Sequence, residues 1–188
     1  MDPSQLFSAP IEPEFATWLR RFNTIEQLFA CRDQLFAKLS TQQLEGSIEE
    51  GVVLVGPIHI SSSSVLRSGT MVEGPVIVGP GSAIGYGVKI LGPTFIGTGV
   101  RVKSGTVLSN CLLMNGSDIA ESCIIQNCII GSAVKASAGC LVGEQSGVGE
   151  HFATCVGDHA HLGLGCIVSP GAIISKRQRV PAGAVIHD

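Results

Sequence analysis

The sequence predicts an all-β solenoid, a parallel β-helix of about seven triangular coils that follows a short N-terminal helical cap. Two observations predict this fold. From Leu54 onward an aliphatic residue recurs at about every sixth position, and the fifth residue of each step is usually small. Glycine follows the aliphatic residue in segments such as VGPGSA and IGYGVK, as a tight turn requires. Three steps close one coil, so residues about eighteen apart stack at the ~4.8 Å spacing of neighbouring strands.

The aliphatic residue of each step is expected to point inward, so Val78, Ile84 and Ile90 should face a common interior. Cysteine often takes the small inward position and is interpreted there as a buried small hydrophobe. The alternative is a ladder of disulfides, which is more typical of short secreted domains. The sequence has no CxxC pair, which leaves a structural zinc site little support. The five inward cysteines are Cys111, Cys123, Cys128, Cys140 and Cys166.

The composition divides the chain near residue 50. Six of the nine aromatic residues precede that point, whereas 23 of the 24 glycines follow it. Only the glycine-rich part can build the solenoid, so we expect a helical segment at 1–50 and the β-helix at 51–188. Residues 40–47 are interpreted as the linker between them.

The first 50 residues have helical spacing. Thr24 and Gln27 form a capping box, and apolar residues recur behind it from Ile25 to Leu39. A shorter helix is expected over Pro13 to Arg21. The simplest interpretation is an amphipathic cap on the first coil or a helix that packs on a partner subunit, and the alternative is an aromatic ligand-binding cluster.

The charge of the chain argues against a nucleic-acid surface. The net charge is −3 and only 14% of the residues are charged. The sequence shows no basic and apolar leader, and no apolar run approaches the length that spans a bilayer. We therefore expect a soluble cytoplasmic protein that binds neither nucleic acid nor membrane.

Three steps depart from the six-residue length. The five-residue steps at Leu108 and Ile125 lie one coil apart and should stack on one corner. An eight-residue step begins at Val148. Because this step is counted as one strand and one turn like the others, Glu121 and Asp158 are expected to lie in one row on the same face. The two residues would be two coils, roughly 10 Å, apart.

The run from Val72 to Gly139 resembles a known family, most clearly in the segments EGPVIVGPGSAIG, SNCLLM and NCIIGSA. It is similar to the C-terminal β-helix of sugar-phosphate nucleotidyltransferases, including the bifunctional N-acetylglucosamine-1-phosphate uridyltransferase/glucosamine-1-phosphate acetyltransferase family. The resemblance covers roughly residues 66–188. It implies left-handed coils, a homotrimer with clefts between subunits, and acyl transfer from acetyl-CoA or another acyl-CoA. Uridyl transfer is not expected, because residues 1–50 carry no glycine-rich nucleotide loop.

The family's acetyltransferase site depends on an arginine and a lysine that hold the sugar phosphate, a histidine base and an asparagine. This chain departs from the pattern at all four positions, with Leu91, Ser109, Glu121 and Lys135 respectively. Leucine and serine cannot supply the cationic clamp of a phosphate. Glu121 remains a candidate base and Lys135 a candidate substrate ligand, together with Asp158.

Three histidines are candidate general bases, because related acyltransferases place a histidine at a subunit cleft. His151 lies in the eight-residue step, and His159 and His161 are outward in the segment VGDHAH. A metal site, as in the γ-class carbonic anhydrases, is a second possibility, although that family's motif spacing is not present. The third is that the histidines are ordinary surface residues.

The last coils contain a basic cluster formed by Lys176, Arg177 and Arg179. The resemblance implies that such residues bind the phosphates of CoA. A charged turn that protects the open edge of the final coil would look the same.

Three classes of function remain open. The first is a CoA-dependent acyltransferase acting on a sugar, sugar phosphate or sugar nucleotide. The second is a catalytically inactive relic of the bifunctional enzyme that serves as an oligomerisation or interaction module. The third is a metal-dependent enzyme. The fold alone does not separate them.

Overall fold

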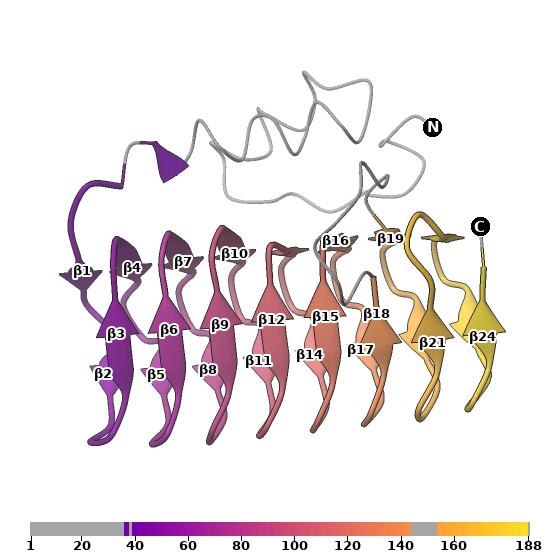
Figure 1. Ribbon diagram of the computed structural model, residues 1–188, viewed down its shortest axis with the longest axis horizontal. Coiled ribbons are helices and arrows are strands. Elements are labelled where there is room, and N and C mark those ends of the chain that lie inside the picture. The colour runs from indigo at the N-terminus through magenta and orange to yellow at the C-terminus, as the bar shows by residue number, and fades with distance from the viewer. Residues whose placement is uncertain (1–35, 38, 144–153, 188) are drawn as a thin grey trace.

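The computed structural model describes residues 36–37, 39–143 and 154–187. The helices expected before residue 36 and the candidate base His151 lie outside the described residues. In the described part, three parallel eight-stranded sheets run side by side along one long axis (Figure 1). The predicted left-handed parallel β-helix is confirmed. No helix in the described ranges is long and apolar enough to span a membrane.

Each turn of the solenoid contributes one strand to each of three sheets, here called A, B and C. Sheet A contains β1 (Gln43–Leu44), β4 (Ile58–Ile60), β7 (Val76–Val78), β10 (Thr94–Ile96), β13 (Leu112–Leu113), β16 (Cys128–Ile130), β19 (Thr154–Val156) and β22 (Ile173–Ile174). Sheet B contains β2 (Ser47–Ile48), β5 (Val65–Leu66), β8 (Ala83–Ile84), β11 (Arg101–Val102), β14 (Asp118–Ile119), β17 (Lys135–Ala136), β20 (His161–Leu162) and β23 (Arg179–Val180).

Sheet C completes each turn. It contains β3 (Val53–Val55), β6 (Met71–Glu73), β9 (Lys89–Leu91), β12 (Val107–Ser109), β15 (Ile124–Gln126), β18 (Leu141–Val142), β21 (Ile167–Val168) and β24 (Val185–Ile186). We number the turns 1 to 8, from β1–β3 to β22–β24. Strand pairing already begins in β1 and β2, within residues 40–47 that the sequence suggested as a linker.

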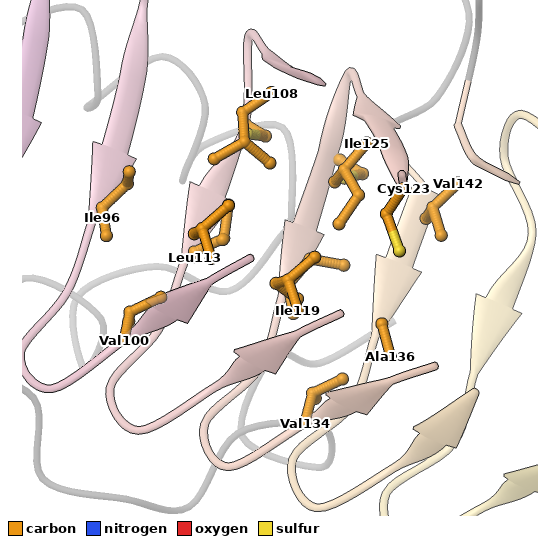
Figure 2. Close-up of a cluster of buried hydrophobic side chains, with 14 of the residues drawn as sticks. Ile96, Val100, Leu108, Leu113, Ile119, Cys123, Ile125, Val134, Ala136 and Val142 are labelled. Atoms are coloured by element: carbon orange, nitrogen blue, oxygen red, sulfur yellow. The ribbon is translucent and has the colours of Figure 1, made fainter. Parts of the chain in front are cut away.

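The interior is built as the six-residue period predicts. Val78, Ile84 and Ile90 are fully buried and belong to one hydrophobic cluster that extends along the solenoid. Figure 2 shows a later part of this cluster, with labelled side chains from Ile96 to Val142. The five cysteines predicted to point inward are buried in the same cluster, without disulfides. Full burial of each aliphatic side chain stabilises the fold by about 1.5–3 kcal/mol.

Small polar residues complete the corners without unpaired groups. The buried hydroxyl of Ser82 donates to the carbonyl of Gly97 at 2.8 Å and accepts from the Val100 N–H at 3.1 Å. Glycine appears where strands approach closely. A Cβ at Gly163, just after β20, would lie 2.5 Å from the backbone nitrogen of Ala182 in the next turn. The repeat thus requires small residues at positions that the sequence pattern identified.

The five-residue steps stack as expected, because Leu108 pairs with Ile125 in sheet C. The row proposed for Glu121 and Asp158 is wrong. Val156 pairs with Ile130 in sheet A, so β19, the next described strand after β18 of sheet C, belongs to sheet A and not to sheet B. Counting Val148 as a step of its own therefore shifted the predicted register of the later strands by one face.

Candidate functional site

The outer surfaces of the three sheets differ in chemistry. Because side chains alternate along a strand, each strand has one or two residues that point away from the interior and stack on their counterparts in the next turn. The outer row of sheet B carries charge from turn 4 onward, whereas the row formed by the first residues of the sheet C strands is almost entirely apolar. In register, the sheet B row is Ser47, Val65, Ala83, Arg101, Asp118, Lys135, His161 and Arg179.

Three exposed basic side chains lie on consecutive strands at the C-terminal end of sheet B. Lys135 on β17 pairs with His161 on β20, which in turn pairs with Arg179 on β23. Neighbouring strands are about 4.8 Å apart, so Lys135 and Arg179 flank the imidazole at about 10 Å from each other. The sequence suggested separate roles for these residues, and the structure brings them together.

The corner between sheets A and B adds three more candidates beside this row. His159 and Arg177 are exposed on successive turns, and Lys176 is half-buried next to Arg177. The backbone fixes their positions, since the Arg177 N–H donates to the Asp158 carbonyl at 2.9 Å and the His159 N–H donates to the Ser132 carbonyl at 2.8 Å. We call the whole group the basic cluster: Lys135, His159, His161, Lys176, Arg177 and Arg179.

One position at this corner has a positive φ in each of turns 2 to 8, but the residue type differs between turns. In turn 2 it is Ser63, with a φ of 60°. In turns 3 to 5 the corner position with positive φ is occupied by glycine: Gly81, Gly99 and Gly116. In turns 6 to 8 it is occupied by Ala133, His159 and Arg177, with φ of 53°, 59° and 60°.

A side chain in the left-handed region costs about 1–2 kcal/mol relative to the ordinary helical region. Such strain tends to persist at functional positions. These non-glycine residues with positive φ were not among the features inferred from the sequence, although the sequence pattern indicates them. VGPGSA and IGTGVR carry glycine at the position where GDHAH carries histidine and SKRQR carries arginine.

Three of the four cations described in turns 1 to 5 have acidic partners, and Lys89 is the exception. Arg67 pairs with Glu49, Arg101 lies 3.8 Å from Asp118, and Lys103 lies 3.5 Å from Glu121. In the part of the chain that the structure describes, no ion pair joins an acid to Lys135, Lys176, Arg177 or Arg179. The last three turns therefore present a concentration of positive charge suited to a ligand with several negative charges.

Glu121 lies apart from the basic cluster. It follows β14 at the corner between sheets B and C, where it is exposed and paired with Lys103. The hydrogen bond from its own backbone N–H and the charge of Lys103 hold the pKa of Glu121 below its ordinary value. A lowered pKa makes a carboxylate a weaker base, which disfavours this residue as a proton acceptor.

Asp158 has a structural position at the corner between sheets A and B. It is fully buried, and its Oδ1 accepts from the backbone N–H of Ser132 at 2.7 Å. Asn115 makes the same contact two turns earlier, accepting from the Thr98 N–H at 2.9 Å. This repetition indicates that Asp158 caps the corner and orients the adjacent His159.

The positions that the family resemblance identified lie on other surfaces. Leu91 and Ser109 are paired neighbours on the outer side of sheet C, and Lys135 lies on sheet B. The uncharged pair therefore occupies a different face from the basic cluster. The described ranges contain no group of three histidine, cysteine or acidic side chains that could hold a metal ion.

The fold and this surface define a class, a hexapeptide-repeat β-helix with a cationic face at its C-terminal end. Residues 72–156, a little under half of the chain, match the model of the GMPPB C-terminal domain family. This match confirms the resemblance of that stretch to the C-terminal β-helix of sugar-phosphate nucleotidyltransferases. No curated protein sequence matches the chain.

Several solved structures are similar to the chain at low identity. A hexapeptide transferase family protein from Anaplasma phagocytophilum is 18% identical, with 74% of this chain and 71% of that chain covered and a TM-score of 0.26. The acetyltransferase domain of PglB from Neisseria gonorrhoeae, in complex with acetyl coenzyme A, is 13% identical, with 84% and 62% covered and a TM-score of 0.32. PerB from Caulobacter crescentus, in complex with CoA and GDP-perosamine, is 9% identical, with 87% and 65% covered and a TM-score of 0.32.

Proposed function

We propose that the protein is a CoA-dependent acyltransferase acting on a hydroxyl or amino group of a sugar, sugar phosphate or sugar nucleotide. The observation that carries the proposal is the row on sheet B, where an exposed histidine lies between two cations that have no acidic partner in the described chain. The match of residues 72–156 to a β-helix of the sugar-phosphate nucleotidyltransferase type supports a sugar-type acceptor.

In the proposed reaction His161 is the general base. The acceptor oxygen or nitrogen attacks the thioester carbonyl carbon, His161 takes the proton of the acceptor, and the carbon–sulfur bond breaks to release CoA as the leaving group. His159, one corner away, is the alternative base. Lys135 binds the anionic group of the acceptor.

The residues of the last turns fit an acyl-CoA. CoA carries three phosphate groups, and guanidinium and ammonium groups form charge-assisted hydrogen bonds to phosphate. Arg177, Arg179 and Lys176 supply these donors on one turn. The cofactor supplies the activated acyl group, and the chain binds and orients it.

The test is acyl transfer from acetyl-CoA to a panel of amino sugars, sugar phosphates and nucleotide sugars, followed by release of the free thiol. His161→Asn should lower kcat by about 10²–10⁴-fold, the usual contribution of a general base. His59→Asn is the matched control, because His59 also points outward but lies on sheet A, hydrogen bonded to Gln43 and Ser61. Absence of turnover and of any acetyl-CoA-induced thermal shift would contradict the proposal.

A second candidate function is an oligomerisation module, and a specific surface favours it. One outward row of sheet C, formed by the first residue of each strand, is apolar in seven of its eight turns, and its side chains are exposed or half-buried. Interface cores are depleted in charge in this way. The row contains Val53, Met71, Lys89, Val107, Ile124, Leu141, Ile167 and Val185. The second outward row, on the three-residue strands, is more polar and contains Glu73, Ser109 and Gln126.

A homotrimer that packs through sheet C is compatible with both functions, because it leaves the basic cluster free. Ile167 is 38% exposed in the single chain, so Ile167→Glu should disrupt the assembly without disturbing the interior. The molar mass in solution, measured by light scattering, would fall to that of one chain. A native protein that is already monomeric would contradict the proposed assembly.

A further inference from the structure

Cysteine occupies the same inward position in three consecutive turns, at the corner between sheets B and C. Cys123, Cys140 and Cys166 each come directly before a sheet C strand, in turns 5, 6 and 7. The strands that follow them pair in register within sheet C. The three side chains therefore stack at about the 4.8 Å spacing of neighbouring strands. We call these three residues the cysteine column.

Packing does not require sulfur at this corner position. The same position holds Thr70 in turn 2, Val88 in turn 3, Thr106 in turn 4 and Ala184 in turn 8. The hydroxyl of Thr106 donates to the Ala120 carbonyl at 2.9 Å, so a hydroxyl side chain is accommodated as well as an apolar one. Because the corner accepts valine, threonine and alanine, three thiols in successive turns add a reactivity that the fold itself does not need.

Two of the three thiols are close enough to react with each other. The Cys166 S–H donates to Cys140 Sγ at 3.6 Å. A disulfide needs Cα atoms about 4.4–6.8 Å apart, and stacked strands in register supply about 4.8 Å. Rotation of the two side chains can therefore bring the sulfurs to bonding distance without moving the strands. The Cys123 S–H, one turn earlier, donates instead to the Ser137 carbonyl at 3.2 Å.

We propose that Cys140 and Cys166 form a reversible disulfide when hydrogen peroxide reaches the corner between sheets B and C. The thiolate of one cysteine attacks a peroxide oxygen, the O–O bond breaks, and water leaves as a sulfenic acid forms on that sulfur. The second thiol attacks the sulfenic sulfur, the S–O bond breaks, and a second water leaves. The two thiols lose two electrons and two protons in total, and the peroxide is reduced to two molecules of water.

The two thiols are buried, but the layer of chain that covers them is thin. Gly139 and Gly165, directly before the two cysteines, are exposed and have φ of 69° and 62°. A Cβ added at Gly165 would meet nothing within 4 Å, so this side of the corner faces open space. Local opening near the end of a stacked array gives a molecule as small as hydrogen peroxide access to the pair.

The disulfide would join turns 6 and 7 covalently. Lys135 and His161 pair on the sheet B strands of those two turns, so the bond would also restrict the distance between them. It would form whether or not the protein transfers an acyl group, because neither cysteine belongs to the basic cluster.

The test is treatment of the native protein with hydrogen peroxide, alkylation of the remaining thiols and a non-reducing peptide map. Two of the seven thiols should be lost, the map should join Cys140 to Cys166, and a dithiol reductant should restore both. The same chain unfolded in urea shows which peroxide dose is effective. A native protein that keeps all its thiols at that dose would overturn the proposal.

Two serine variants identify the partners within the cysteine column. Cys166→Ser should form a disulfide at least about tenfold more slowly than the native protein, because the partner 3.6 Å from Cys140 is lost. Cys123→Ser is the matched control and should form it at the native rate. An equal loss of rate in both variants would overturn the assignment, and so would a disulfide that maps to another pair, such as Cys111 and Cys128 on successive turns.

Discussion

Turns 1 to 5 and turns 6 to 8 follow the same repeat, but they differ in the ion pairs of their cations and in the residue type at the corner position with positive φ. In the earlier turns, Arg67, Arg101 and Lys103 are paired with acids. Glycine also occupies the strained corner position there in turns 3 to 5. In the later turns the cations have no acidic partner among the described residues, and His159 and Arg177 occupy the strained position. The comparison supports the proposal that the earlier turns serve as scaffold and that the basic cluster of the last three turns binds the ligand.

The largest effect is expected in the scaffold. Ile119 on β14 is fully buried, and its neighbours in the same inward column are Val102 and the small Ala136. Ile119→Ala should lower the free energy of unfolding by about 2–5 kcal/mol, because the cavity cannot be filled from either side. Chemical denaturation measures the loss. Ile124→Ala, at a half-buried outer position one step later, should cost less than about 1 kcal/mol.

The next effect concerns the charges. The double variant Arg177→Met, Arg179→Met should weaken binding of CoA or inorganic pyrophosphate by about 10²–10⁴-fold, since each charged hydrogen bond contributes about 1.5–3 kcal/mol. Calorimetry at low and high salt would measure the change. The control is Arg101→Met in the same outer row, where Asp118 already partners the cation. If both variants lost the same affinity for the ligand, the proposal that the late turns bind it would be contradicted.

A smaller effect is expected from glycine variants of His159 and Arg177. These variants distinguish a side chain that binds ligand from one that supports the fold. His159→Gly and Arg177→Gly relieve positive φ angles of 59° and 60°, so the free energy of unfolding should stay equal or rise by about 1 kcal/mol while ligand affinity falls. Gly99→Ala is the inverse control at the same corner. Its φ is +63° and an added Cβ would contact nothing, so it should lose about 1–2 kcal/mol from backbone strain alone. A clear destabilisation by both glycine variants would show that these side chains support the fold.

The smallest effect lies in turn 1. The hydrogen bond from Arg67 and that from the Ser68 N–H hold the pKa of Glu49 below its ordinary value. This carboxylate therefore contributes stability above its unfolded pKa and loses the contribution as the pH falls through its folded pKa. Glu49→Gln should melt slightly below the native protein at pH 7, and the difference should vanish once the pH falls below the lowered pKa of Glu49 in the folded protein. A difference that persists in acid would mean that shape, and not charge, matters at this position.

Much of the fold follows from the period alone. The inward positions of Val78, Ile84 and Ile90 were predictable because a step of six fixes which side chain faces the interior. The register of turn 7 was not predictable, because the sequence between β18 and β19 departs from the six-residue period and offers Val148 as an apparent extra step. The early strands β1 and β2 were also missed, since Gln43, Leu44 and Ser47 lack the aliphatic and small alternation of later turns.

The site was predictable in its members but not in its arrangement. Lys135, His161 and Arg179 were recognised as candidates from residue type, yet their pairing depends on how the chain returns after residue 143. The burial of Asp158 depends on the same corner, and the sequence shows only an acid next to a histidine. Interactions between turns need the register, which local spacing does not determine when one turn is longer.

The stacking of turns also determines where the chain opens first. Each strand bonds only to the strands directly before and after it, so β22, β23 and β24 have neighbours on one side only. Amide hydrogens of these terminal strands should exchange with deuterium sooner than those of β12 or β13. Arg179 lies on β23, so a ligand that binds to it should slow the exchange of the amide hydrogens in β22, β23 and β24. Ligand binding would then stabilise the last turn against local opening.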